Sequence, residues 1–328
     1  MTICNTKYRN WVQKFQINDL FQNSIYPVIS YSKLGLIIIL YSKHILSGFA
    51  IYFLFGYGIN CARNNIQPTA KIQNIDYLIN QGKILWDQRI DSLALKKAEH
   101  FINLAYQQRQ NDFELSVLFS KLSFTRAYFF EDKISNQDSL FFQGSVTCKK
   151  AVMRHSEFAQ IYSMSKGDSV FKLLSAIADA PVSIVPGLYW WGINLGMYLN
   201  NQPVLERIKQ RELLEVIMHR VISLDPGFYF SGPYRFFGSL YTRIPGVELS
   251  QSKTYFNQAI TANPEYFGNK VLMAQFYYQK SGNREEFNKT LKTIINADLN
   301  KYPEIMADNF FYQKKAKSLL KNEPVLFE

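Results

Sequence analysis

The sequence predicts an all-α fold of stacked helical hairpins, preceded by an apolar N-terminal segment. Apolar residues recur at the 3.6-residue spacing of amphipathic helices, and similar unit ends recur along the second half of the chain. Strand-like alternation bounded by turns does not recur in the sequence. We expect an N-terminal extension and anchor over residues 1–60, a linker over 61–72 and a helical repeat domain over 73–322.

The composition is that of a folded protein. With 328 residues, of which 47% are hydrophobic and 19% charged, the chain can bury a core in one or two domains. The formal net charge is +11, but the basic residues are spread thinly and form no block of the kind that binds nucleic acid. We therefore expect no nucleic-acid partner.

Cysteine and histidine usage gives no support to a metal site, a cofactor or a catalytic centre. Three cysteines are too few and too scattered for a disulfide framework or a zinc knuckle, and the four histidines are isolated. Cys148 and His155 share one face of a helix, but no neighbouring residue would activate the thiol. The protein is predicted to be non-enzymatic, without a metal or a cofactor.

The longest apolar run covers residues 34–59, more than the roughly 20 residues that cross a bilayer. If Lys43 and His44 form the charged start of a signal sequence, residues 45–57 are its apolar region. Cys61 would then stand where a bacterial lipoprotein carries its acylated cysteine. An uncleaved membrane anchor and a buried core helix are the alternatives, and the long preceding extension would also fit a true start downstream of the first residue.

Three helices are predicted in the first part of the body. Apolar spacing predicts helices over residues 75–85 and 93–105. Asp112 is placed to cap a third helix over residues 113–127. Gly82 interrupts the first pattern without ending it.

Internal repetition is the strongest structural signal. Residues 224–226, 262–264 and 297–299 have similar sequences and mark unit ends, and their last residues are 38 and 35 positions apart. Both spacings are close to the 34-residue period of tetratricopeptide repeats. We predict about four degenerate tetratricopeptide-like units, which bury their apolar faces by stacking.

The repeat alignment also predicts where helices interlock. Small and large residues take equivalent places in two units, with Gly282 at the turn of the last one. The interlocking residues are Gly238, Tyr241, Ser252, Phe256 and Ala259 in one unit and Ala274, Tyr277, Phe287, Leu291 and Ile294 in the next. Looser units carry Trp191, Gly192, Leu214, Met218 and Val221, and Trp86, Ala94, Ala98 and Phe101.

Aromatic residues and one arginine mark a candidate binding site. Arg235 falls in the first turn of a predicted helix, where the helix dipole disfavours a cation, so we expect it to have a specific partner. That partner is either an internal carboxylate, with the aromatic residues filling the core, or the carboxylate of an amphipathic solute in an apolar cleft. The candidate cleft residues are Tyr189, Trp190, Trp191, Asn194, Arg235, Phe236 and Phe237.

Several segments resemble the T-component (TatT) family of TRAP transporters. They are residues 187–196, 224–226, 232–238, 245–246 and 256–264. The resemblance is good over residues 175–320 and only general over 70–175. Tyr234 stands where the family often has histidine, and residues 247–249 replace a glycine-rich turn, which affects the local loop and any ligand contact there.

The resemblance implies a periplasmic lipoprotein of cryptic tetratricopeptide repeats, lipidated at Cys61. Its implied partner is the solute-binding protein of a tripartite, ATP-independent transporter. The resemblance also implies an apolar cleft for a hydrophobic or organic-acid ligand, a tendency to form homotrimers, and attachment to a membrane through lipid or the N-terminal anchor. The alternative function is a tetratricopeptide-type interaction scaffold at the membrane that is unrelated to transport.

Overall fold

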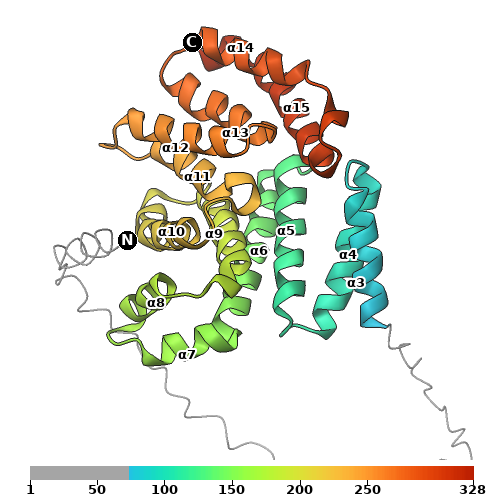
Figure 1. Ribbon diagram of the computed structural model, residues 1–328, viewed down its shortest axis with the longest axis vertical. Coiled ribbons are helices and arrows are strands. Elements are labelled where there is room, and N and C mark those ends of the chain that lie inside the picture. The colour runs from blue at the N-terminus through green and yellow to red at the C-terminus, as the bar shows by residue number, and fades with distance from the viewer. Residues whose placement is uncertain (1–73) are drawn as a thin grey trace, which may run out of the picture. The chain divides into compact units, whose positions relative to one another are not determined.

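The computed structural model describes residues 74–328, and every element in that range is a helix (Figure 1). The predicted all-α class is therefore confirmed. The helices up to residue 178 are α3 (Ile75–Asp87), α4 (Ser92–Gln108), α5 (Phe113–Phe129), α6 (Ile134–Arg154), α7 (Ser156–Met164) and α8 (Ser169–Ala178).

The second half begins with a short 3₁₀ turn and ends with a short helix. Its elements are η1 (Val182–Ile184), α9 (Val185–Leu199), α10 (Val204–Leu224), α11 (Phe228–Tyr241), α12 (Leu249–Ala262), α13 (Phe267–Leu272), the π-helical η2 (Met273–Tyr278), α14 (Arg284–Ile295), η3 (Leu299–Lys301), η4 (Pro303–Ile305), α15 (Met306–Lys321) and α16 (Glu323–Leu326). The predicted apolar segment, the linker and Cys61 lie outside the described residues.

Side chains cap the starts of the first helices. An Asp112 carboxylate oxygen accepts a hydrogen bond from the Leu115 N–H at 3.0 Å, which confirms the predicted start of α5. Asn74 and Asp91 cap α3 and α4 in the same way. These caps satisfy backbone donors that would otherwise lack partners at each helix start.

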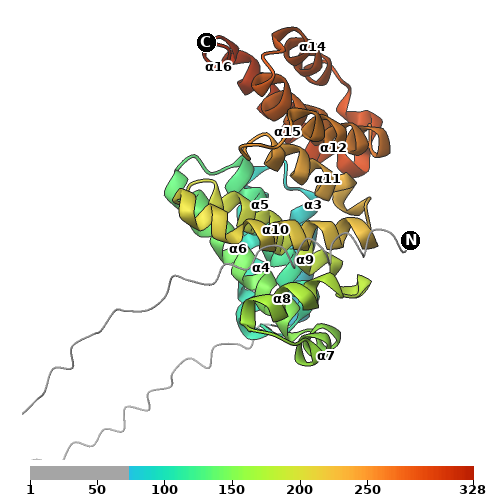
Figure 2. The same cartoon turned by 90° about the vertical axis from the view of Figure 1, so that its left-hand side faces the viewer.

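Consecutive helices pack against each other as hairpins. α3 packs on α4, α5 on α6 and α11 on α12, while α9 lies against both α6 and α10. The hairpins follow one another from α3 and α4, in blue, to α14 and α15, in red (Figures 1 and 2). The all-helical stack matches the predicted architecture, and its specific likeness to tetratricopeptide units remains a prediction.

The residues predicted to interlock are in close contact. A Cβ atom at Gly238 would lie 2.8 Å from the ring of Phe256, and Ser252 Oγ donates a hydrogen bond to the Gly238 carbonyl at 2.7 Å. On the preceding hairpin, a Cβ at Gly192 would lie 2.7 Å from Met218 Cε. Glycine at these positions lets the paired helices approach closely enough for the larger side chains to fill the space.

Two predicted turns use glycine for its backbone conformation. Gly246 and Gly282 have φ angles of +80° and +69°, and a Cβ at either would meet no atom within 4 Å. Only the backbone conformation therefore favours glycine there, since this left-handed region is costly for other residues.

None of the single helices in the described range is long and apolar enough to cross a membrane. The segments Ser169–Ala178 and Val182–Leu199 reach the required length and hydropathy only as a pair, and that pair is bent by 105°. Much of α9 is buried in the core instead.

The last long helix returns to the first part of the domain. Phe311 on α15 stacks on Phe129 at the end of α5, with ring centroids 5.0 Å apart, and packs edge-on against Phe130 at 5.1 Å. Asp308 on the same helix pairs with Arg89, which follows α3, at 2.5 Å. The N-terminal hairpin and α15 are therefore held together directly, 219 residues apart in sequence.

Replacing Ala259 with tryptophan tests the packing of α12. Ala259 has no exposed surface, so the added volume must displace neighbouring helices. We expect Ala259→Trp to lower the free energy of unfolding by about 1–3 kcal/mol or more, measured by denaturant unfolding. Lys253→Trp on the exposed side of the same helix is the control and should change stability by less than about 0.5 kcal/mol. Equal stability of both variants would contradict the packing described here.

Candidate functional site

The first turn of α11 is left-handed. Tyr229, Phe230 and Ser231 have φ angles of 45°, 57° and 60°. Consecutive left-handed residues with side chains are rare, because each costs roughly 1–2 kcal/mol relative to right-handed backbone. Surrounding contacts must therefore hold this turn, and from Gly232 onward the helix is right-handed.

Arg235 and Asn269 hold the left-handed turn. Arg235 donates hydrogen bonds from Nη1 to the Phe230 carbonyl at 3.0 Å and from Nη2 to the Tyr229 carbonyl at 3.3 Å. Its Nη1 also donates to Asn269 Oδ1 at 2.7 Å. The Asn269 Nδ2 in turn donates to the carbonyls of Phe230, Ala259 and Asn263.

Aromatic rings complete the support of this turn. Phe230 stacks on Tyr266 with centroids 4.6 Å apart, and the Arg235 guanidinium lies 4.8 Å from the centroid of the same ring. Asn263 Nδ2 donates to Ser231 Oγ at 2.6 Å. These hydrogen bonds and ring contacts offset the local backbone strain of the turn.

Arg235 has specific hydrogen-bond partners in the structure, as the sequence analysis expects. Arg235 is only 5% exposed, and its guanidinium binds backbone carbonyls and the Asn269 amide, with no carboxylate partner among residues 74–328. Its role as a contact for a solute remains a proposal.

All seven predicted cleft residues are buried, and they form more than one group. Tyr189 and Trp190 pack against Tyr229, with ring centroids 5.8 and 4.9 Å apart, beside the turn that Arg235 holds. Burial raises the pKa of Tyr189, which Arg235 partly opposes. These residues meet although they come from α9 and α11.

The other predicted residues face different neighbours. Phe237 packs on His219 with centroids 4.4 Å apart. Asn194 Nδ2 donates to the carbonyls of Trp190 and Ser120, which ties α9 to α5. Trp191 lies under Lys149 of α6, and Phe236 lies against Gly196.

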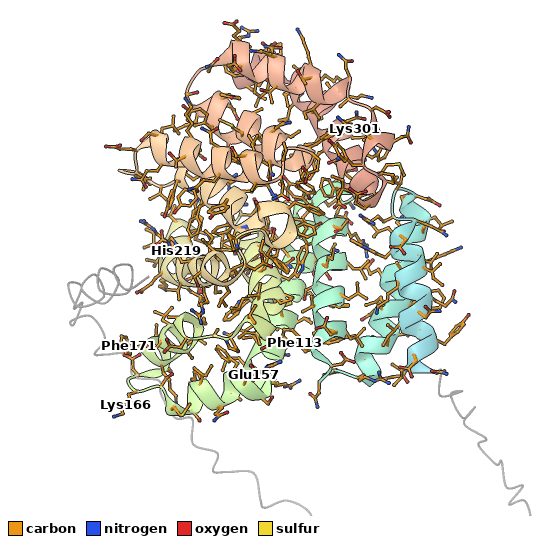
Figure 3. The ribbon with its side chains drawn as sticks, in the orientation of Figure 1. Phe113, Glu157, Lys166, Phe171, His219 and Lys301 are labelled. Atoms are coloured by element: carbon orange, nitrogen blue, oxygen red, sulfur yellow. The ribbon has the colours of Figure 1, made fainter. Side chains whose placement is uncertain are left out.

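The structure also has a groove on the second half of the domain, which the sequence analysis did not predict. Two adjoining hollows of about 570 and about 390 Å³ share Tyr234, Thr254 and Gln258. The lining residues are Pro226, Gly227, Ser231, Tyr234, Thr254, Asn257, Gln258, Thr261 and Ala262 in the larger, with His219, Ile222, Gln251 and Tyr255 added by the smaller. We call this the α10–α12 groove; His219 is labelled on α10 in Figure 3.

The surface of the α10–α12 groove is mostly apolar, with amide and hydroxyl groups among its lining residues but no carboxylate, lysine or arginine. Burial lowers the pKa of His219, which favours its neutral form. Its amides and hydroxyls can both donate and accept hydrogen bonds, and Tyr234 and Tyr255 add aromatic surface. Such a lining favours recognition by hydrogen bonding and ring contacts over recognition of charge. The one sequence feature that pointed to this groove is Tyr234, within the family-like segment.

The one cysteine–histidine pair noted in the sequence is not assembled for nucleophilic chemistry. Cys148 is fully buried, and burial raises the pKa of its thiol to about 12. His155 lies at the junction of α6 and α7, edge-on to Phe113. Among the described residues, no three His, Cys, Asp or Glu side chains are grouped so that they could hold a metal ion.

The described residues thus form an all-helical protein of stacked hairpins with a groove on one side, an architecture that does not by itself assign a function. Residues 134–327 match the model of the TRAP transporter T-component family, which is more than half of the chain. The protein therefore belongs to this family and is an accessory component of a TRAP transporter. No curated protein is significantly similar to it in sequence. The suspected resemblance is thus confirmed.

Adding a methyl group at Gly232 tests the contact between α9 and the residue that follows the left-handed turn. A Cβ at Gly232 would lie 2.3 Å from Tyr189 Oη, so the buried tyrosine ring or the helix must shift. We expect Gly232→Ala to lower the free energy of unfolding by about 1–3 kcal/mol. Gly227→Ala, where the nearest atom would be 3.6 Å away, is the control and should change it by less than about 0.5 kcal/mol. Similar unfolding midpoints for both variants would disprove the close contact.

Proposed function

We propose that this protein is a non-enzymatic, periplasmic accessory component that docks the solute-binding protein of its TRAP transporter. Membership of the T-component family carries this proposal, because the matched residues include α6 to α16 and the whole α10–α12 groove. Tethering to the membrane, through acylated Cys61 or an uncleaved apolar segment, would keep the protein near the transporter. A scaffold unrelated to transport is disfavoured by the family match.

We propose the α10–α12 groove as the docking face. Tyrosine is enriched at protein interfaces, and a groove of neutral amides and hydroxyls can follow a partner's backbone without desolvating a charge. Tyr234 and Tyr255 lie with ring centroids 6.2 Å apart and offer a central aromatic contact.

The predicted homotrimer would use another surface. The apolar side chains exposed there are Val170 and Phe171 of α8 and Val204, Leu205 and Ile208 of α10.

Tyr234→Ala tests the docking face. We expect the dissociation constant for the transporter's solute-binding protein to rise about tenfold, since a central aromatic contact is lost. The measurement is calorimetry with purified full-length protein. Lys280→Ala, between η2 and α14 and outside the groove, is the control and should bind as the wild type does. If wild-type protein does not bind, the docking function is wrong; if both variants bind normally, only the docking face is wrong.

A second proposed function is passage of a hydrophobic or amphipathic carboxylate solute. It is supported by the aromatic cluster in which Tyr189, Trp190 and Tyr229 meet beside Arg235. Of the seven residues predicted from the sequence, Tyr189, Trp190 and Arg235 lie at this cluster and are the candidate walls of the cleft. In this proposal Arg235 acts by fixing the turn that presents Tyr229.

Arg235→Ala tests the cleft. Without the guanidinium, the carbonyls of Tyr229 and Phe230 lose a donor, so we expect the turn to relax and a co-purified organic acid to disappear from native mass spectra. The helical circular dichroism signal should persist. A variant that is less stable but retains the ligand would assign Arg235 to structure alone.

A further inference from the structure

The turn between α7 and α8 exposes large apolar side chains. Met164, at the end of α7, and Val170, in the first turn of α8, are each 64% exposed, and Phe171 is 47% exposed. Phe171 lies over the turn, since a Cβ at Gly167 would be 2.7 Å from its ring. Exposed apolar side chains gathered in so short a segment are typical of a surface that has a partner. We call residues 164–171 the α7–α8 turn.

The charges around the α7–α8 turn suit an apolar layer with a polar boundary. Residues 158–165 carry no charged group, and the nearest cations are Lys166 and Lys172. The Asp168 carboxylate caps the start of α8 by accepting hydrogen bonds from two backbone N–H groups. Lysine stems are long enough for neighbouring apolar side chains to enter lipid while the ammonium groups stay at its surface.

The described chain begins at the same end of the domain. Arg109, after α4, donates from Nη1 to Asp76 Oδ1 in the first turn of α3 at 3.2 Å. Arg154, at the end of α6, donates from Nη1 to Asn111 Oδ1 in the α4–α5 connection at 3.0 Å. The start of α3 and the start of α7 are thus linked through the α4–α5 connection, at the lower end of the domain in Figure 1.

The proposed membrane tether reaches the domain at this end. Cys61 is 13 positions before Asn74, and a chain of that length spans at most about 45 Å. Figure 3 shows Phe171 and Lys166 at the lower end as well, with His219 of the α10–α12 groove farther up. A tether of this reach makes contact between the lower end and the bilayer intramolecular, so that a small apolar surface suffices.

We propose that the α7–α8 turn is a second membrane contact, which inserts Met164, Val170 and Phe171 into the interface of a phospholipid bilayer. The ammonium groups of Lys166 and Lys172 lie at the level of the lipid phosphates. The inference rests on the proposed tethering and goes beyond it, because it fixes which end of the domain faces the membrane. The α10–α12 groove is then left clear for the solute-binding protein.

A second copy of the chain is the competing occupant of the turn. Val170 and Phe171 are also among the side chains that the predicted homotrimer would cover. The bilayer is favoured because the turn lies at the end of the domain where the tether enters. Flanking lysines also favour lipid phosphates, which would attract them.

The test replaces Phe171 with tryptophan and measures quenching by lipid. Full-length protein is reconstituted in vesicles of equal parts phosphatidylcholine and phosphatidylglycerol, with or without bromine on the acyl chains, and the wild-type emission is subtracted. Bromine quenches only a ring that it contacts. We therefore expect brominated lipid to reduce the emission of Phe171→Trp. Lys253→Trp, exposed on α12, is the control and should lose no emission.

Adding Val170→Asp to Phe171→Trp tests the insertion itself. A carboxylate at the turn cannot enter the apolar layer, so the quenching should be lost while the protein stays on the vesicles through its tether. Val325→Asp, on α16 and 72% exposed, is the control and should leave the quenching unchanged. Both valines are exposed, so the melting temperature should change in neither variant.

Three results would overturn the inference. Protein that floats with the vesicles without quenching of Phe171→Trp would remove the membrane contact and keep the tether. Blue-shifted emission without quenching, together with dissociation of an oligomer by Val170→Asp in analytical ultracentrifugation, would assign the turn to the homotrimer. Protein that does not float with the vesicles would reject the tether and the contact together, while docking of the solute-binding protein is measured separately.

Discussion

The buried carboxylate of Asp308 is the contact on which the arrangement of the domain depends. It binds Arg89 in the turn of the first hairpin, between α3 and α4, and Tyr229 in the left-handed turn, so three distant parts of the chain meet at two oxygens. Burying this ion pair costs desolvation energy, and removing either partner would leave an unpaired charge in the interior. The pair therefore specifies how the stack of hairpins closes, more than it adds net stability.

The left-handed turn follows from the same constraint. Tyr229, whose hydroxyl donates to Asp308 at 3.0 Å, is the first of the three residues at which the chain leaves the right-handed helical path. Arg235 and Asn269 supply the hydrogen bonds that offset the strain. Such strained backbone persists only where its surroundings hold it, and here those surroundings come from α11, α12 and α13.

Two regions of different chemistry result. The α10–α12 groove is lined by uncharged side chains, whereas the core around the left-handed turn is aromatic and holds the buried Arg235. Ser231 connects them, because it lines the groove and forms the last residue of the left-handed turn.

Local features were determined by the sequence itself. The all-helical class, the Asp112 cap and the close approach of Gly238 to Phe256 could be read from spacing, because caps and interlocking helices involve residues near one another in the chain. Only the tertiary structure decided the partners of Arg235 and the pairing of Arg89 with Asp308. A left-handed turn without glycine has no local signature, and Arg89 and Asp308 are 219 residues apart in the sequence. The packing of distant helices brings these groups together, so no local pattern in the sequence could pair them.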